Sequence, residues 1–470
     1  MSEATPAAQS SSRLHGRLLS WRAAGEQSGP LRHNPRVWLY RLLSAAGLIF
    51  YSPYALARAL LGRRRLGDVR GRFGWTRYPD LGGGIWVHAV SVGEVGVARN
   101  VISALARRAP AQKVGLSVTT EAGRQLAETI AGDALPIFAF PFDLAGPVEK
   151  ALASVRPGLI LLTETEIWPL FLERAAAHAI PVALINGRIS LRSFRRYRLI
   201  ARWLAERFSH MALFAMQSPA DAERIVALGA PASRVHVTGN LKYDTPEAPP
   251  FSDADRLRRA AAGRPILVAA STAEGEEETV LQAWQSLSPR PLLALAPRRP
   301  ERFDSVAALV ERAGFSVLRR SSASNPESPI PHPASRTPGP DTVYLLDSIG
   351  ELSSLYREAR AAFIGGSLVP RGGQNPIEAW SAGVPALAGP HTENFRQVMA
   401  DGERHGFLRR VSDAASLAQE LAPLLSAAGG MSASGERARR FVAENRGAAE
   451  RTVELLLPLL APRAERRAVP

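Results

Sequence analysis

The stretch that decides the fold is IWVHAVSVGE, residues 85–94, in which an apolar run is followed by a short polar loop with a glycine. An apolar run of this length is typical of a buried strand, and the sequence after the loop favours a helix to about Arg107. The strand pattern recurs at KVGLSVTT (113–120), LPIFAFP (135–141), GLILLTE (158–164), PVALING (181–187) and LFAMQS (213–218). Apolar strands that alternate with helices indicate a parallel sheet covered on both faces.

A proline-rich segment, TPEAPPFSDAD (245–255), interrupts this series and is typical of a linker. The same pattern then restarts at PILVAAST (265–272), PLLALAP (291–297), FSVLRR (315–320), VYLLD (343–347), AAFIGGS (361–367) and PALAG (385–389). We therefore expect an α/β protein with two doubly wound, Rossmann-like domains and a ligand cleft between the carboxyl edges of their sheets. The expected segments are an α/β domain at 67–244, a linker at 245–256, a second α/β domain at 257–462 and a basic tail at 463–470. The polar, proline-rich stretch 321–340 is predicted to be a surface loop.

Composition excludes several kinds of site. The 470-residue chain has no cysteine, so disulfides, thiolate metal sites and thiol nucleophiles are excluded. Its histidines lack the spacing of a zinc site, and we predict no metal site. The net charge of +15 is concentrated at the start, where residues 1–72 hold twelve arginines and three acidic residues. Such a segment favours either nucleic acid or an anionic membrane surface as partner.

An apolar stretch from Val37 to Leu61 decides between these partners. Its cleanest part, Leu42 to Leu56, is shorter than the ~20 residues of a confident membrane span. Tyrosines and arginines near its ends suit the headgroup layer of a bilayer. We therefore expect a membrane-anchoring helix at 37–66 after a disordered basic segment at 1–36, an anionic inner-membrane surface as partner, and no nucleic acid. A helix packed on a soluble domain is the alternative.

Three groups of residues in the first domain are candidates for chemistry. Glu94 follows a glycine at a turn from strand to helix, where it could accept a proton from a hydroxyl nucleophile or simply stabilise the helix start. Glu164 and Glu166 follow the strand GLILL and share one face if the strand geometry continues; solvated capping acids are the alternative. Lys242 is one of only three lysines in the chain and could reach a phosphate or carboxylate.

The second domain carries the nucleotide signals. PRRPER, residues 297–302, ends a strand with a cluster of cations, and GGS, residues 365–367, ends another. RGGQNPIEA, residues 371–379, leads from two glycines into a helix, an arrangement that can hold an anion at the helix start, with Glu378 near a ribose. Taken one at a time, the arginines could form a solvated surface patch, and the glycines could serve only tight turns.

Taken together, eight segments resemble the 3-deoxy-D-manno-octulosonic acid (Kdo) transferase family of lipopolysaccharide synthesis. They are HAVSVGE (88–94), TETEIWP (163–169), INGRIS (185–190), VTGNLKYD (237–244), STAEGEEE (271–278), PRRPERF (297–303), GGSLVPRGGQNPIEA (365–379) and GPHTENF (389–395). The resemblance implies a GT-B glycosyltransferase at the cytoplasmic face of the inner membrane. It implies CMP-Kdo as donor, the lipid A precursor as acceptor, inversion at the anomeric carbon, and no cofactor or metal.

The resemblance also assigns roles to residues. Glu94 matches the general base, and Glu164 and Lys242 match positions that stabilise the transition state. The segments that match CMP-binding positions comprise Pro297, Arg298, Ile349, Gly350, Glu351, Asn375, Pro376, Ile377 and Glu378.

The sequence departs from the family pattern at three places. Arg299 and Gln374 stand where histidine is usual, and TTEAGR, residues 119–124, is shorter than the usual segment. The first two departures lie beside the nucleotide motifs and keep open a transferase for another nucleotide sugar, or an epimerase of similar architecture. A non-enzymatic membrane scaffold is the third alternative. The motifs do not give the number of Kdo units transferred or the oligomeric state.

Overall fold

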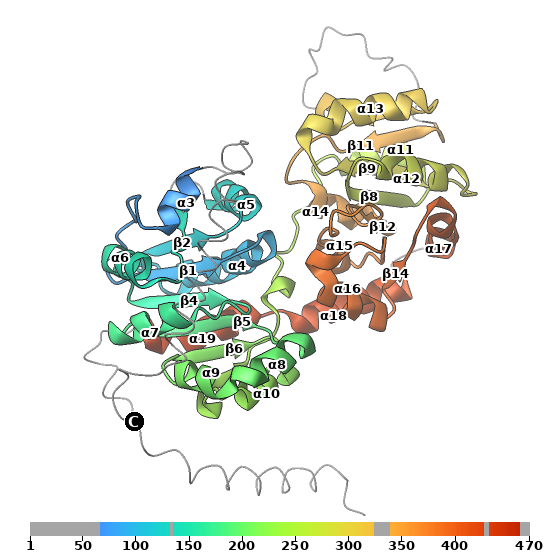
Figure 1. Cartoon of the computed structure of the whole chain (residues 1–470). Coiled ribbons are helices and arrows are strands. Elements are labelled where there is room, and N and C mark those ends of the chain that lie inside the picture. The colour runs from blue at the N-terminus through green and yellow to red at the C-terminus, as the bar shows by residue number, and fades with distance from the viewer. Residues whose placement is uncertain (1–65, 132–134, 324–338, 427–431, 461–470) are drawn as a thin grey trace, which may run out of the picture. The chain divides into compact units, whose positions relative to one another are not determined.

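The computed structural model describes residues 66–131, 135–323, 339–426 and 432–460 (Figure 1). The basic segment 1–36, the tail 463–470 and the centre of the 321–340 loop lie outside these ranges. The anchoring helix expected at 37–66 also lies outside them, except for Leu66, which begins helix α3 (Leu66–Arg72). Within the described ranges, no helix is both long and apolar enough to cross a bilayer.

The first domain is built on a seven-stranded parallel sheet in the order β3-β2-β1-β4-β5-β6-β7. Its strands are β1 (Ile85–Ala89), β2 (Val114–Val118), β3 (Ile137–Ala139), β4 (Leu159–Thr163), β5 (Val182–Gly187), β6 (Leu213–Met216) and β7 (Val235–Val237). The helices between them are α4 (Val92–Arg108), α5 (Glu121–Ala131), α6 (Ala145–Val155), α7 (Pro169–Ala177), α8 (Leu191–Tyr197), α9 (Ala201–Phe208) and α10 (Pro219–Ala227), with 3₁₀ turns η2 (Arg198–Ile200), η3 (Ala232–Arg234) and η4 (Leu241–Tyr243).

Both faces of this sheet are covered, as the near-continuous apolar strands predict. Trp86 belongs to one core cluster, and its neighbours Ile85 and Val87 belong to a second cluster on the other face. Strand β4 follows the same alternation, with Ile160 in the first cluster and Leu161 in the second. The expected double winding of the first domain is therefore confirmed.

The second domain repeats this plan with a seven-stranded parallel sheet in the order β10-β11-β9-β8-β12-β13-β14. Its strands are β8 (Ile266–Thr272), β9 (Leu292–Pro297), β10 (Ser316–Arg319), β11 (Thr342–Leu345), β12 (Ala361–Ile364), β13 (Ala386–Ala388) and β14 (Leu408–Arg410). The helices are α11 (Ala254–Ala261), α12 (Glu276–Gln285), α13 (Phe303–Arg312), α14 (Leu352–Leu355), α15 (Ile377–Ser381), α16 (Arg396–Arg404), α17 (Ala414–Ser426) and α18 (Ala433–Asn445), with 3₁₀ turns η5 (Pro300–Arg302), η6 (Ser321–Ala323), η7 (Tyr356–Glu358) and η8 (Glu393–Phe395). Val268 and Leu267 lie in core clusters on opposite faces of this sheet.

The last described helix, α19 (Ala448–Leu460), belongs to the first domain, although we expected the second domain to continue to residue 462. Val453 and Leu456 are fully buried in the cluster that holds Ile85 and Val87, and α19 packs on α4 and β6 (Figure 1). The carboxylate of Asp244 accepts hydrogen bonds from the backbone N–H groups of Gly447 and Ala449 and so caps the start of the helix. The apolar face of α19 therefore completes the core of the first domain, and the core of the second domain ends before it.

Candidate functional site

Each sheet has one place where the strand order reverses, and ligands of open α/β sheets bind at the carboxyl edge beside that place. In the first sheet the chain runs from β1 outward to β3 and returns to β4, which lies on the other side of β1. Residues 91–94 follow β1, and residues 164–166 follow β4. In the second sheet the corresponding strands are β8 and β12, followed by 273–276 and 365–368.

Glu94 lies in the first turn of α4, directly after β1. Its Oε2 accepts hydrogen bonds from the Val90 backbone N–H at 2.9 Å and from the Thr163 hydroxyl at 2.7 Å. Its Oε1 accepts one from the Ser91 hydroxyl at 3.0 Å. The residue is only 8% exposed, and this burial raises the pKa of its carboxyl, with a smaller contribution from the charge of Glu164. A carboxylate with a raised pKa is a stronger base, as proton abstraction from a hydroxyl requires.

The side chains of Glu164 and Lys242 meet at the same edge. Lys242 lies in η4 and its Nζ donates to Glu164 Oε1 at 2.7 Å. A Cβ atom at Gly93 would lie 3.9 Å from this Nζ, so the ammonium group lies beside the first turn of α4, which carries Glu94. Both side chains of the pair are about one-sixth exposed, which leaves the ion pair accessible from solution. The structure therefore brings together the three catalytic residues expected from the sequence.

Glu166, which was a candidate for chemistry but received no role from the family resemblance, joins this group. Burial and the nearby charge of Glu94 raise the pKa of its carboxyl to about 7, despite a hydrogen bond from the Trp168 indole N–H at 3.0 Å. The pair of glutamates in the sequence was the signal for it. Three carboxylates with one lysine therefore lie at the switch point of the first sheet.

A different carboxylate lies at the switch point of the second sheet. Glu276, the first residue of α12, is completely buried. Its Oε2 accepts from the backbone N–H groups of Gly366 at 2.6 Å and Ala273 at 2.8 Å, and its Oε1 accepts from those of Ser367 and Leu368, both at 2.8 Å. The N–H groups that follow β12 are therefore occupied by the protein's own carboxylate and do not form an open anion cradle.

The next residue, Glu277, is also completely buried and forms a bidentate ion pair with the guanidinium group of Arg302, with N···O distances of 2.8 and 2.9 Å. The Thr272 hydroxyl donates to the same carboxylate at 2.7 Å. These contacts give STAEGEEE (271–278) and PRRPERF (297–303) a structural role in addition to their resemblance to family motifs. The signal in the sequence was the run of glutamates that follows the predicted strand at 265–272.

The residues that we expected at the nucleotide all follow strands of the second sheet on its carboxyl edge. Pro297 is the last residue of β9, and Arg298 follows it. Residues 349–351 follow β11, and residues 375–378 follow β12. Because β11, β9, β8 and β12 are consecutive in the sheet, these segments lie along one edge. Asn375 Oδ1 accepts from the Ile377 N–H at 3.0 Å and orders the start of α15. Burial raises the pKa of Glu378 on the same helix.

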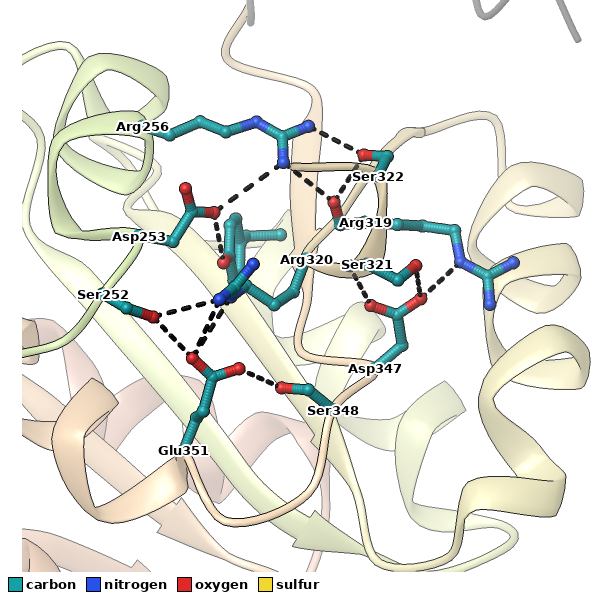
Figure 2. Close-up of polar contacts among 11 residues, drawn as sticks. Ser252, Asp253, Arg256, Arg319, Arg320, Ser321, Ser322, Asp347, Ser348 and Glu351 are labelled. Carbon is teal, nitrogen blue, oxygen red and sulfur yellow. Dashed lines mark hydrogen bonds and ion pairs between the residues drawn. The ribbon is translucent and has the colours of Figure 1, made fainter. Parts of the chain in front are cut away.

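The residues of the segment Ile349-Gly350-Glu351 have different environments. The Glu351 carboxylate accepts hydrogen bonds from Arg320 at 3.0 Å and from Ser252 at 2.6 Å, and Figure 2 shows it pointing into this network. Burial acts to raise the pKa of Glu351, but these hydrogen bonds, together with one from Ser348, outweigh it and lower the pKa. Ile349, by contrast, is 78% exposed, and Gly350 has a φ of 88° that favours glycine. The side chain of Glu351 is thus engaged within the protein, and Ile349 faces solution.

The same network fixes the neighbouring strand ends. Asp347 accepts from Arg319 at 2.7 Å and from the Ser321 backbone N–H at 2.7 Å, while Arg256 donates to the Arg319 carbonyl at 3.0 Å (Figure 2). These contacts join α11 to the ends of β10 and β11. They hold the loop that carries residues 349–351 in place.

The two departures from the family pattern have different surroundings. Arg299 is exposed and lies 3.6 Å from Glu301 in an ion pair. Gln374 is half-buried, and its Nε2 lies 3.3 Å from the position that a Cβ at Gly366 would take. Within the described ranges, no group of three or more histidine, aspartate or glutamate side chains is arranged to hold a metal ion.

The amino-acid sequence is similar to those of several known proteins. Residues 67–245 match the family model described as 3-Deoxy-D-manno-octulosonic-acid transferase (kdotransferase). A 3-deoxy-D-manno-octulosonic acid transferase of Bordetella pertussis is 36% identical over 405 residues, which cover 82% of this chain and 90% of that protein. The enzyme of the same name from Haemophilus influenzae is 34% identical and covers 85% of this chain and 92% of its own length. The solved C-terminal CMP-Kdo binding domain of WaaA from Acinetobacter baumannii is 25% identical and covers 45% of this chain and 98% of that chain, with a TM-score of 0.30. By its extensive similarity to the two bacterial enzymes, the chain belongs to the 3-deoxy-D-manno-octulosonic acid transferase family and is a glycosyltransferase.

Proposed function

We propose that the protein transfers Kdo from CMP-Kdo to the lipid A precursor, lipid IVA, at the cytoplasmic face of the inner membrane, with Glu94 as the general base. The two α/β domains would be the acceptor and donor halves of a GT-B enzyme, and the reaction would invert the anomeric carbon without a metal ion. The observation that carries the proposal is the environment of Glu94, a nearly buried carboxylate of raised pKa beside a lysine.

The proposed reaction is a single displacement at the anomeric carbon of Kdo. Glu94 takes the proton of an acceptor hydroxyl while the hydroxyl oxygen bonds to the anomeric carbon of Kdo. The bond from that carbon to the phosphate oxygen breaks, and CMP leaves with the electron pair. Negative charge moves toward the leaving phosphate, so a fixed cation near the reacting atoms lowers the barrier. Lys242, held by Glu164 at 2.7 Å, is the cation that we assign to this role.

The experiment is transfer from CMP-Kdo, generated in situ, to lipid A precursor, with products counted by mass spectrometry. Product with one or more added Kdo units supports the donor and acceptor together and gives the number of additions. The anomeric configuration of the product tests inversion, and parallel reactions with a chelator test the independence from metal. A folded enzyme that binds CMP but forms no product would contradict the proposed donor or acceptor.

A transferase for another nucleotide sugar is the second candidate, and Arg299 and Gln374 are the observations that favour it. They alter the charge and shape beside the expected nucleotide segment. Preference for UMP over CMP in equilibrium binding would support this candidate. The epimerase and scaffold alternatives lose support because the family is one of transferases.

A further inference from the structure

A second feature of the first domain lies outside the proposed catalytic group. Residues 188–202, RISLRSFRRYRLIAR, contain six arginines and no acidic residue. They form α8, η2 and the start of α9, directly after β5. Their inner side packs on the core through Phe194, Tyr197 and Ala201, so the fold determines which side faces outward.

The outward side combines unpaired cations with exposed aliphatic groups. Arg192, Arg195, Arg196, Arg198 and Arg202 are all exposed, and none of them makes a side-chain hydrogen bond or ion pair with any residue that the structure describes. Among them lie Leu199, which is 86% exposed, Leu191 at 63% and Ile200 at 42%. Three of the seven large apolar side chains that are exposed in the described ranges therefore lie within ten residues. Apolar groups gathered at the surface indicate a binding face.

We propose that this surface, residues 188–202, docks the first domain onto an anionic lipid bilayer. Arginines attract anionic headgroups, and the aliphatic side chains enter the boundary between headgroups and acyl chains, as in amphipathic helices that lie on membranes. Nucleic acid explains the charge alone, because phosphate contacts do not require exposed leucine and isoleucine. The mixture of the two kinds of side chain favours the bilayer.

The surface at residues 188–202 lies close to the catalytic edge of the first sheet. Strand β5 lies beside β4, so the surface begins at the same carboxyl edge at which Glu164 follows β4. The backbone N–H of Ile189 donates to Asp221 at 2.8 Å, which fixes the start of the segment. If the acceptor is a lipid, which rests on the proposed function, docking through this surface brings the catalytic edge of the domain to the membrane that holds the acceptor.

The test measures binding of the full chain to sedimented vesicles of phosphatidylcholine with and without phosphatidylglycerol, in the absence of donor and acceptor. The electrostatic variant is R195Q/R196Q, and its matched control is R259Q/R440Q, which removes two exposed arginines that also lack partners in the described ranges. Each arginine near an anionic surface is worth about five-fold in binding, or about 1 kcal/mol, so R195Q/R196Q should bind anionic vesicles about 25-fold more weakly than the control. Leu199→Ser should cause a several-fold loss on both kinds of vesicle, because apolar burial does not depend on lipid charge.

Equal binding by R195Q/R196Q and its control would overturn the proposal, since the attraction would then not depend on this surface. Unchanged vesicle binding with a selective loss of affinity for single-stranded RNA would overturn it in favour of nucleic acid. The measurement contains no sugar nucleotide, so a failure of the proposed transfer reaction leaves its outcome unaffected.

Discussion

Glu94 and Glu276 occupy matching positions in the two domains, each in the first turn of the helix that follows the strand beside the switch point. Their hydrogen bonds differ. A carboxylate offers about four lone-pair sites, and Glu276 uses them on four backbone N–H groups. Glu94 accepts one backbone N–H and two hydroxyls, which leaves a site on Oε1 among the described contacts. Topology therefore places a carboxylate at the carboxyl edge of each sheet, while the number of hydrogen-bond donors around it decides whether it can accept a proton.

The largest expected effect comes from Glu94→Gln. If the open site on Oε1 receives the acceptor proton, turnover should fall by about 10²–10⁴ because the amide cannot act as a base. CMP affinity and the free energy of unfolding should change little. The measurement is single-turnover transfer together with CMP titration, and turnover equal to that of the parent enzyme would show that Glu94 is not the general base.

Lys242→Met should have the next largest effect. Loss of a fixed cation near developing negative charge should lower turnover by about 10²–10³. Lys113→Met is the matched control, because Lys113 is an exposed lysine of the same domain. A similar small loss in both variants would show that the pair with Glu164 only stabilises the fold.

Glu276→Gln tests the carboxylate whose lone-pair sites are all occupied by backbone N–H groups. The amide nitrogen would face backbone donors that now bind a carboxylate oxygen, so we expect the free energy of unfolding to fall by about 3 kcal/mol. Glu278→Gln on the same helix, where the side chain is exposed, should change it by less than about 0.5 kcal/mol. Chemical denaturation measures both. Unchanged stability with lost turnover would move Glu276 into the catalytic group.

Glu166→Gln should have a smaller, pH-dependent effect. The pKa of Glu166 is raised from 4.5 to about 7, so the folded state favours the protonated form. Its contribution to stability is full below pH 4.5 and is lost as the pH rises through about 7. The amide mimics the protonated form, so the variant should melt above the parent protein at pH 8 and near it at pH 4. Melting temperatures at the two pH values check this, and an equal difference at both would contradict it.

Apolar periodicity predicted the double winding and all the strands except β7 and β14. The group of Glu94, Glu164 and Lys242 was predicted by the resemblance to the transferase family. The sequence did not predict that Glu276 fills the N–H groups after β12, since that contact joins residues 90 positions apart. Nor did it place α19 in the first domain, because the apolar pattern of a helix does not show which core the helix packs against. The pKa of Glu166 likewise depends on burial and on the approach of Glu94, which only the folded chain provides.

The smallest expected effect separates the two departures from the family pattern. Gln374 lies against the loop that Glu276 holds, whereas Arg299 is exposed and its only described ion pair is with Glu301. If the rigid loop shapes the nucleotide segment, Gln374→His should change KM for CMP-Kdo several-fold. Arg299→His should change it less, because an exposed ion pair contributes less than about 1 kcal/mol. Steady-state kinetics of the two variants with CMP-Kdo measure this order. The reverse order would mean that the nucleotide contacts the arginine directly, and that the loop held by Glu276 has little influence on donor binding.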